Sequence, residues 1–377
     1  MVWYFDIANM LVCMLATLIA CRINLIPYWI GFILVIYSIL PFFLNDFLFP
    51  ASYMKDQFYY FNALSEIRSF NYFPEMDKNA VITSWFLNIL PIPFVETVKS
   101  LGFFNRFLFL ILFLWLYSKK FLQGMTLFFV LFYPSLVLYT SLSFRDPLIL
   151  FLMIIGTICL VDKKYLTFFL VILPLYFIKF QNFFFMLTLW GIFMIFKKPP
   201  LNYRIRYIFF GLIIFGFYSY INDIIYLLNL SRRAFFVEDG NSLLLYEPIV
   251  DIFNMLILGA TSLPNFVMKP LPWQADNSFQ FIQSIENILV VFFLIIFTLN
   301  AYKKDKLITI KWILFFSFVM SVHGMIVFNY GTAVRYKFIF IMVHVVGLAY
   351  ELHKVHGYLL FFDFKKMIPK KKNNFLN

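Results

Sequence analysis

The feature that most limits the fold of this chain is its series of long apolar segments, which recur from the N-terminus to residue 352. An apolar segment of about 20 residues crosses the hydrocarbon core of a bilayer as one helix. The segments do not alternate with a period of two residues, as the strands of a membrane barrel would. The sequence therefore predicts an all-α polytopic membrane protein with about eleven transmembrane helices, which form a single integral membrane domain over residues 1–377. The expected spans are 5–21, 26–45, 103–118, 123–141, 147–161, 165–178, 182–196, 206–228, 283–301, 307–328 and 337–352.

Composition agrees with this class and excludes others. The chain is 63% hydrophobic and only 13% charged, which is outside the usual range of a soluble globular domain. Its three cysteines lie in or at the ends of apolar segments, so we expect no disulfide framework. The cysteines do not have the spacing of a metal site, and Glu351, His353 and His356 fit a solvated cluster at the membrane interface better than a metal site. We therefore expect no metal, no cofactor and no nucleic-acid partner.

The basic residues predict the orientation of the helices. Most of them follow the odd-numbered spans or fall in the C-terminal segment 353–377, which places them on one side of the predicted protein. The positive-inside rule assigns that side to the cytoplasm. We expect the N-terminus outside, a basic cytoplasmic tail at 353–377, and two long extracytoplasmic loops at about 46–102 and 229–282. The basic residues that follow the odd-numbered spans are Arg22, Lys119, Lys120, Lys163, Lys164, Lys197, Lys198, Arg204, Arg206, Lys303, Lys304 and Lys306.

Several cations fall on the outer side, where topology does not require them. Charges at membrane depth are costly and are usually kept near a polar pathway or site, so these cations are candidates for ligand contacts. Lys179 and Lys337, taken singly, also fit interfacial residues whose long side chains reach the membrane surface. The remaining outer cations are Arg145, Arg232, Arg233, Lys269 and Arg335.

Arg145 and Asp146 are adjacent at the junction of two apolar segments, and Pro147 follows them. Proline fits the first turn of a helix, and an aspartate just before it can cap the free N–H groups of that turn. The plain interpretation is a capped helix start beside an interfacial arginine. The functional interpretation is that Asp146 orients Arg145 towards a ligand.

The first outer loop combines aromatic rings with carboxylates. Residues 50–68 predict a helical segment that carries Asp56, Tyr60 and Glu66. Rings with neighbouring carboxylates suit a carbohydrate, although an amphipathic helix in the membrane interface is the plainer alternative. Residues 80–98 are apolar but are interrupted by two prolines, so we expect them to lie in the interface or to re-enter the membrane.

The second outer loop is rich in proline. The prolines from Pro264 to Pro272 predict an extended turn in place of a continuous helix. A helix that carries Glu286 should follow from Phe279 onward. In the last outer turn, Gly331 would allow a tight bend before Arg335 opens the final helix.

Three short segments of the chain resemble segments of a known protein family. They are "SLSFRDPLILF", which contains Arg145, the proline-rich "LPNFVMKPLPW", and "NYGTAVRYKF", which contains Arg335. Together with the phenylalanine-rich spans, these segments resemble those of the Wzy-type O-antigen polymerases. Some members of that family carry an Arg-x10-Gly motif in outer loops. Arg145 reaches Gly156 after ten residues, whereas Arg335 reaches Gly347 after eleven, which departs from the motif.

The resemblance implies an enzyme of the bacterial inner membrane. Such a polymerase would transfer a growing glycan from undecaprenyl pyrophosphate to the next lipid-linked repeat unit on the outer face of that membrane, without a metal. Its partners would be the undecaprenyl-pyrophosphate-linked oligosaccharide and membrane lipid, and the resemblance leaves room for a chain-length regulator protein. The product would be an O-antigen, a capsule or another polysaccharide.

The resemblance and the chemistry of arginine together suggest roles for the outer residues. Arginine binds phosphate oxygens with two parallel hydrogen bonds and stays protonated, so it suits a pyrophosphate group. A carboxylate would accept the proton of the attacking hydroxyl. The expected substrate contacts are Arg145, Arg233 and Arg335, with Arg232 as an alternate and Lys269 and Tyr336 as further contacts. The expected catalytic carboxylates are Asp56, Glu66 and Glu238, with Asp146 as the residue that orients Arg145.

Two alternatives remain open at this point. A GT-C glycosyltransferase would use a polyprenyl-monophosphate sugar, but those enzymes commonly place an acidic pair in the first outer loop, and Asp56 is single. A flippase or transporter for the same lipid-linked oligosaccharide would often show two repeated halves with broken helices, and no internal repeat is evident.

Overall fold

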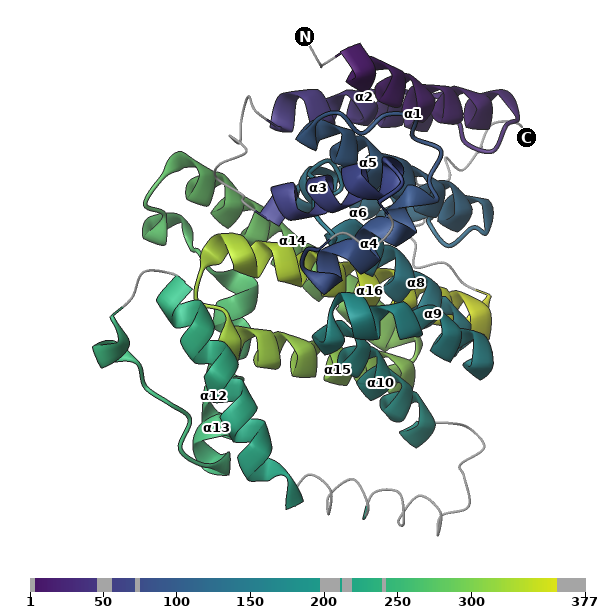
Figure 1. Ribbon diagram of the computed structural model, residues 1–377. Helices are drawn as coiled ribbons and strands as arrows, with labels where there is room; N and C mark the ends of the chain where they lie inside the picture. Colours follow the sequence, from purple (N-terminus) through teal and green to yellow (C-terminus); the bar gives the residue numbers. More distant parts are fainter. Residues whose placement is uncertain are drawn as a thin grey trace, which may run out of the picture.

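The computed structural model describes residues 4–45, 56–71, 75–196, 211, 219–238 and 242–357. Within these ranges the chain is helical and contains no β-strand, and its helices pack into one bundle (Figure 1). The helices are α1 (Tyr4–Arg22), α2 (Tyr28–Leu44), α3 (Asp56–Arg68), α4 (Lys78–Asn88), α5 (Val98–Ser118), α6 (Gly124–Phe132), α7 (Pro134–Tyr139), α8 (Asp146–Val161), α9 (Tyr165–Ile178), α10 (Phe180–Ile195), α12 (Ile221–Glu238), α13 (Ile252–Met268), α14 (Ser278–Lys304), α15 (Lys306–Ile326) and α16 (Tyr330–His356). Two short 3-10 turns, η2 (Leu243–Leu245) and η3 (Pro272–Gln274), lie between helices.

The helices have the length and composition of a membrane protein. Among the described residues, five helices are long and apolar enough to cross a bilayer, namely α1, α5, α14, α15 and α16. Five shorter apolar helices, α2, α8, α9, α10 and α13, accompany them. The prediction of a membrane-embedded, all-helical chain is thereby confirmed. The predicted span at 206–228 lies outside the described residues at 206–210 and 212–218, and its last part, from Ile221 onward, belongs to α12.

Helix α16 is the central element of the bundle. It packs against α8, α14 and α15, and its residues from Phe338 to Leu348 are almost all buried (Figure 1). Gly347 allows one of these contacts, because a Cβ atom there would overlap the fully buried ring of Trp312. The indole Nε1 of Trp312 in turn donates a hydrogen bond to Glu351 Oε2 at 2.8 Å. The middle of α16 is therefore closely fitted to α15.

Ion pairs join α8 and α16 at both ends. Near the start of each helix, Arg335 Nε lies 2.5 Å from Asp146 Oδ2. At the other ends, Lys354 Nζ lies 2.5 Å from Asp162 Oδ1. The two helices therefore run side by side in the same direction. Since α8 has 16 residues, the two ion pairs are separated by about 24 Å along the helix axis.

The first of the two predicted outer loops contains a hairpin of two helices, as far as it is described. Helices α3 and α4 pack against each other, and the chain then continues without regular structure through Pro91 and Pro93. Arg68 at the end of α3 donates to Asn88 Oδ1 at 2.9 Å and to the carbonyl of Leu90 at 3.2 Å. The prediction of a helix at 50–68 is confirmed from Asp56 onward, and so is the break at the two prolines.

Two predicted elements differ from the structure. The predicted span 123–141 is divided into α6 and α7, because Pro134 starts a new helix. The predicted extended turn between Pro264 and Pro272 begins later than expected: α13 continues through Pro264 to Met268, and the chain is extended at Lys269 and Leu271. Proline costs about 3 kcal/mol inside a helix, and packing of α13 on α15 offsets this cost. Gly324 makes that contact close, because a Cβ there would lie 2.7 Å from the carbonyl oxygen of Ser262.

Replacing Gly347 with Ala should destabilise the bundle by about 1–3 kcal/mol, because the added methyl group must displace the Trp312 ring from a closely packed site. Thermal unfolding of the purified protein in detergent would measure this loss. Gly191→Ala is the matched control, since open space surrounds Gly191 on α10 and alanine favours a helix. Equal melting temperatures for the two variants would contradict the packing described for Gly347.

Candidate functional site

The junction between α7 and α8 is held in place by side chains from three other helices. Asn105 of α5 donates to the carbonyls of Leu142 and Phe144 at 2.6 and 2.8 Å. Gln57 of α3 accepts from the backbone N–H of Ser143 at 3.1 Å. Asn45, after α2, donates to the carbonyl of Ser141 at 3.2 Å. These bonds satisfy backbone groups that belong to no helix, and they fix the position from which α8 starts.

Asp146, Arg335 and Asp56 form a chain of ion pairs at the start of α8. Arg335 binds Asp146 through Nε at 2.5 Å and Asp56 through Nη1 at 3.0 Å. The Asp146 side chain is fully buried, whereas that of Asp56 is 54% exposed. The guanidinium also lies over the ring of Phe144, with Cζ 4.1 Å from the ring centroid. Three helices, α3, α8 and α16, thus meet at one arginine.

Two further cations lie beside this chain of ion pairs. Arg145 donates through Nη1 to the carbonyl of Ile178 at 2.9 Å, and its Cζ lies 5.9 Å from the ring centroid of Tyr60. Its Nε is buried and has no hydrogen-bond partner in the part of the chain that the structure describes. Lys179, between α9 and α10, places Nζ 3.4 Å from the ring centroid of Tyr336. We call Asp56, Arg145, Asp146, Lys179 and Arg335 the outer cluster.

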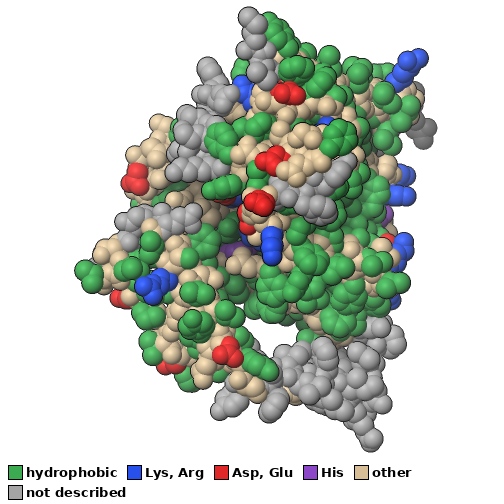
Figure 2. Space-filling view, in the orientation of Figure 1, with side chains coloured by type: hydrophobic (Ala, Val, Ile, Leu, Met, Phe, Trp, Pro, Cys, Tyr) green, Lys and Arg blue, Asp and Glu red, His purple; other side chains and the backbone are tan. Residues whose placement is uncertain are grey.

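The outer cluster has more positive than negative groups and suits an anionic ligand. Its three cations face two carboxylates, and Asp146 and Asp56 are both engaged by Arg335. Burial lowers the pKa of Lys179 well below its usual value, and the charges of Arg145 and Arg335 add to this effect while Asp146 opposes it. An anion bound among these groups would stabilise the charged ammonium and accept hydrogen bonds from the arginines. Figure 2 shows acidic and basic side chains close together near the middle of a largely hydrophobic face.

The predicted role of Asp146 needs correction. The residue before it, Arg145, is the N-cap of α8, and no side chain caps that helix end. The carboxylate of Asp146 is directed to Arg335, so it neither caps α8 nor pairs with Arg145. A buried guanidinium that lacks a paired charge is strongly unfavourable, which accounts for the pairing of Asp146 with Arg335.

Other residues expected in the site lie elsewhere. Arg232 of α12 donates to the carbonyl of Met325 and lies 5.3 Å from the ring centroid of Phe328, so it stabilises the end of α15. Arg233, the next residue on α12, is exposed. Lys269 ends α13, and its carbonyl accepts from Asn287 at 2.9 Å. The structure does not bring these three cations into the outer cluster.

The two other expected carboxylates are also apart from the cluster. Glu66 accepts from Asn71 at 2.7 Å and lies ten residues after Asp56 on α3, which is about 15 Å along the helix. Glu238 ends α12, and its side chain lies outside the described residues. Tyr336, in contrast, belongs beside the cluster through its contact with Lys179.

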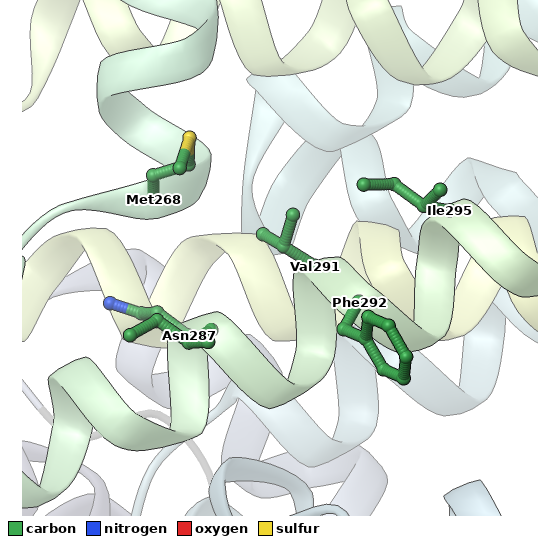
Figure 3. A pocket seen from close by; sticks show the side chains of 6 residues that line it. Met268, Asn287, Val291, Phe292 and Ile295 are labelled. Carbon is green, nitrogen blue, oxygen red and sulfur yellow. The ribbon is translucent and has the colours of Figure 1, made fainter.

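An apolar groove of about 220 Å³ lies beside α14, next to the end of α13 (Figure 3). Its one polar lining residue, Asn287, is already bonded to the carbonyl of Lys269 and to Lys337 Nζ. The groove can accommodate a hydrocarbon chain but offers no group for chemistry. It is lined by Met268, Asn287, Ile288, Val291, Phe292 and Ile295.

No protein-family model, curated protein or solved structure matches this chain. Among the residues that the structure describes, no three His, Cys, Asp or Glu side chains are grouped so that they could hold a metal ion. The outer cluster is therefore the feature of the molecule from which a function can best be inferred.

Asp146→Ala should destabilise the protein by about 3–5 kcal/mol, because Arg335 would lose its buried acidic partner. Asp56→Ala should cost no more than about 1 kcal/mol, because an exposed ion pair contributes little. Unfolding of the two purified variants in detergent would compare the losses directly. Similar losses for both would contradict the unequal burial of the two carboxylates.

Proposed function

We propose that this chain is a polysaccharide repeat-unit polymerase of the Wzy type. It transfers a growing glycan from undecaprenyl pyrophosphate to the next lipid-linked repeat unit, on the outer face of the inner membrane. The observation that best supports this proposal is the convergence of Arg145, Lys179 and Arg335. They come from three separate parts of the chain and meet at one end of the helix bundle.

The chemistry of the transfer requires such a group of cations. As the bond between the anomeric carbon and the pyrophosphate oxygen breaks, negative charge develops on the leaving group. Cations and N–H donors already fixed in a site that excludes water stabilise this charge most effectively. Arg145 offers a buried Nε with no partner among the described residues, and Lys179 is held against Tyr336. Neither cation forms an ion pair with a carboxylate among the described residues, so both are available to pair with a pyrophosphate.

Asp56 is the carboxylate best suited to accept the proton of the attacking hydroxyl. Asp146 is fully buried and bound to Arg335, so it is not accessible to a sugar. Asp56 has a half-exposed side chain in the same cluster, and an exposed carboxylate can release the proton to water after each turnover. Tyr60, one turn further along α3, is buried and lies beside Arg145, so it helps to hold this arginine at the site.

The distribution of charge supports an orientation with the outer cluster outside the cytoplasm. At the opposite ends of α8 and α16 lie Asp162 and Lys354, and the turn between α14 and α15 is close by, because His356 contacts Asp305 there at 3.0 Å. That turn carries three lysines, and basic side chains gather along the right-hand edge of the molecule in Figure 2. The positive-inside rule assigns this edge to the cytoplasm, in an eleven-span protein with its N-terminus outside.

A flippase for the same lipid-linked oligosaccharide is the second candidate, and one observation favours it. Lys311 and Glu351 form an ion pair with side chains only 6% and 12% exposed. Charges at membrane depth are typical of transport pathways. A purified protein in liposomes separates the two functions, because a polymerase makes new glycosidic bonds without a nucleotide, whereas a flippase moves the lipid unchanged.

Arg145→Ala should reduce polymer formation about 10²–10³-fold, because it removes one charge-stabilising donor from the developing anion. The purified protein, supplied with lipid-linked repeat units, would be scored by the ladder of products on a gel. Lys78→Ala is the matched control, since Lys78 is an exposed outer cation on α4 that lies outside the cluster. A normal ladder from Arg145→Ala would remove this arginine from the site.

Cysteine labelling tests the orientation. In a chain whose three native cysteines are replaced by alanine, Asp276→Cys should react with a membrane-impermeant maleimide in intact cells, because Asp276 is exposed on the outer side. Lys303→Cys, exposed at the other end of α14, should react only after the membrane is opened. The reverse pattern would place the outer cluster in the cytoplasm and contradict the proposed topology.

A further inference from the structure

We propose that Asp56 is an exchangeable internal anion, which occupies Arg335 until the pyrophosphate of the lipid donor displaces it and thereby frees the carboxylate to act as the base. This inference rests on the proposed function, because it assigns the sequence of events at the same site. The additional feature is that the Asp56 carboxylate and the pyrophosphate compete for the guanidinium of Arg335.

The two carboxylates on Arg335 are unequal partners. Asp146 is fully buried and lies 2.5 Å from Nε, whereas Asp56 is 54% exposed and lies 3.0 Å from Nη1. Breaking a buried ion pair is strongly unfavourable, but an exposed pair contributes little. An incoming anion will therefore replace Asp56 and leave Asp146 in place. Arg335 keeps its position throughout, since Asp146 continues to hold it.

The helix that carries Asp56 is anchored independently of this ion pair. Gln57, which is buried, binds the N–H of Ser143, and Ser84 of α4 donates to the carbonyl of Tyr60 at 3.2 Å. Displacement therefore needs only a rotation of the Asp56 side chain, and α3 stays in place. The released carboxylate remains within one side-chain length of the bound pyrophosphate.

A pyrophosphate oxygen gains more at this position than Asp56 does. Arginine binds phosphate through parallel N–H donors, and the neighbouring Arg145 has a buried Nε with no partner among the described residues. Lys179 adds a third positive group that neither carboxylate contacts in an ion pair among the described residues. Asp56 pairs with the exposed side of Arg335, whereas a pyrophosphate bound there would also face the charges of Arg145 and Lys179.

The transfer step moves one proton to Asp56 and one glycan to the acceptor. The acceptor hydroxyl gives its proton to the freed Asp56 carboxylate, and its oxygen forms a bond to the anomeric carbon of the donor glycan. The bond from that carbon to the pyrophosphate oxygen breaks, and its electron pair leaves with undecaprenyl pyrophosphate, where the cations of the cluster stabilise it. Asp56 returns its proton to water and pairs again with Arg335 as the product leaves.

The test measures pyrophosphate binding and transfer in the same variant. Asp56→Asn in the full-length purified protein should bind inorganic pyrophosphate about two- to fivefold more tightly than the original chain, because the competing charge is gone. The same variant should lose at least 100-fold in polymer formation, because the amide cannot accept a proton. Calorimetric titration and the lipid-linked ladder assay provide the two readouts. If Asp56 had only a structural role, Asp56→Asn would weaken both pyrophosphate binding and polymer formation.

Two controls separate the possible outcomes. Asp77→Asn removes an outer carboxylate that caps α4 instead of contacting Arg335, so it should change neither quantity. Arg145→Ala should weaken pyrophosphate binding at least tenfold. If Arg145→Ala weakens binding but Asp56→Asn does not tighten it, the exchange is wrong and the pyrophosphate site stands. If Arg145→Ala leaves binding unchanged, the proposed pyrophosphate site itself is wrong.

Discussion

The buried ion pair between Asp146 and Arg335 is the interaction on which the outer end of the bundle depends. Neither charge could remain there alone, because an unpaired buried charge costs several kcal/mol. The pair therefore fixes how far α16 is displaced along α8, and that alignment places Lys354 beside Asp162 at the other end. Asn105 completes the arrangement, since it holds the turn from which Asp146 projects.

This ion pair also sets the charge balance of the outer cluster. Three cations with no carboxylate would repel one another strongly in a site of low polarity, and they would hold an anionic product too tightly for turnover. Asp146 stays paired with Arg335, whereas Asp56 can pair with the same guanidinium and withdraw. Burial and the charges of the two arginines lower the pKa of Lys179, and a bound anion would oppose this shift. The cluster can thus accept an anion and release it.

The sequence predicts most of the helices and some of the site. Long apolar segments are strong signals, so the helical class and the helix ends near Arg22, Ser118 and Val161 could be predicted closely. Arg145 and Arg335 stand out in the sequence because the predicted topology puts them on the side that needs no basic residues. Their proximity is a tertiary property, and Asp146 and Arg335 are 189 residues apart, so no local pattern indicates that they meet.

Some residues were assigned to the wrong place because residues of the same chemical type can have different tertiary partners. Arg232 and Arg335 are both outer arginines, yet Arg232 binds the carbonyl of Met325 and belongs to the end of α15. Lys179 resembles an ordinary interfacial lysine until the turn between α9 and α10 places it against Tyr336. Pro264 signals a break, but the close contact that Gly324 permits keeps α13 helical.

The two aspartates suit different roles because their side chains are buried to different extents. A base must return its proton to water in every cycle, and a carboxylate with no exposed surface exchanges protons slowly with solvent. Asp146 therefore suits the permanent partner of a cation, whereas Asp56, on a surface helix, suits the group that alternates between a cation and a proton. In the proposed cycle, Asp56 that has lost its proton would compete again for Arg335 and so favour departure of the pyrophosphate. Its return would couple regeneration of the base to release of the product.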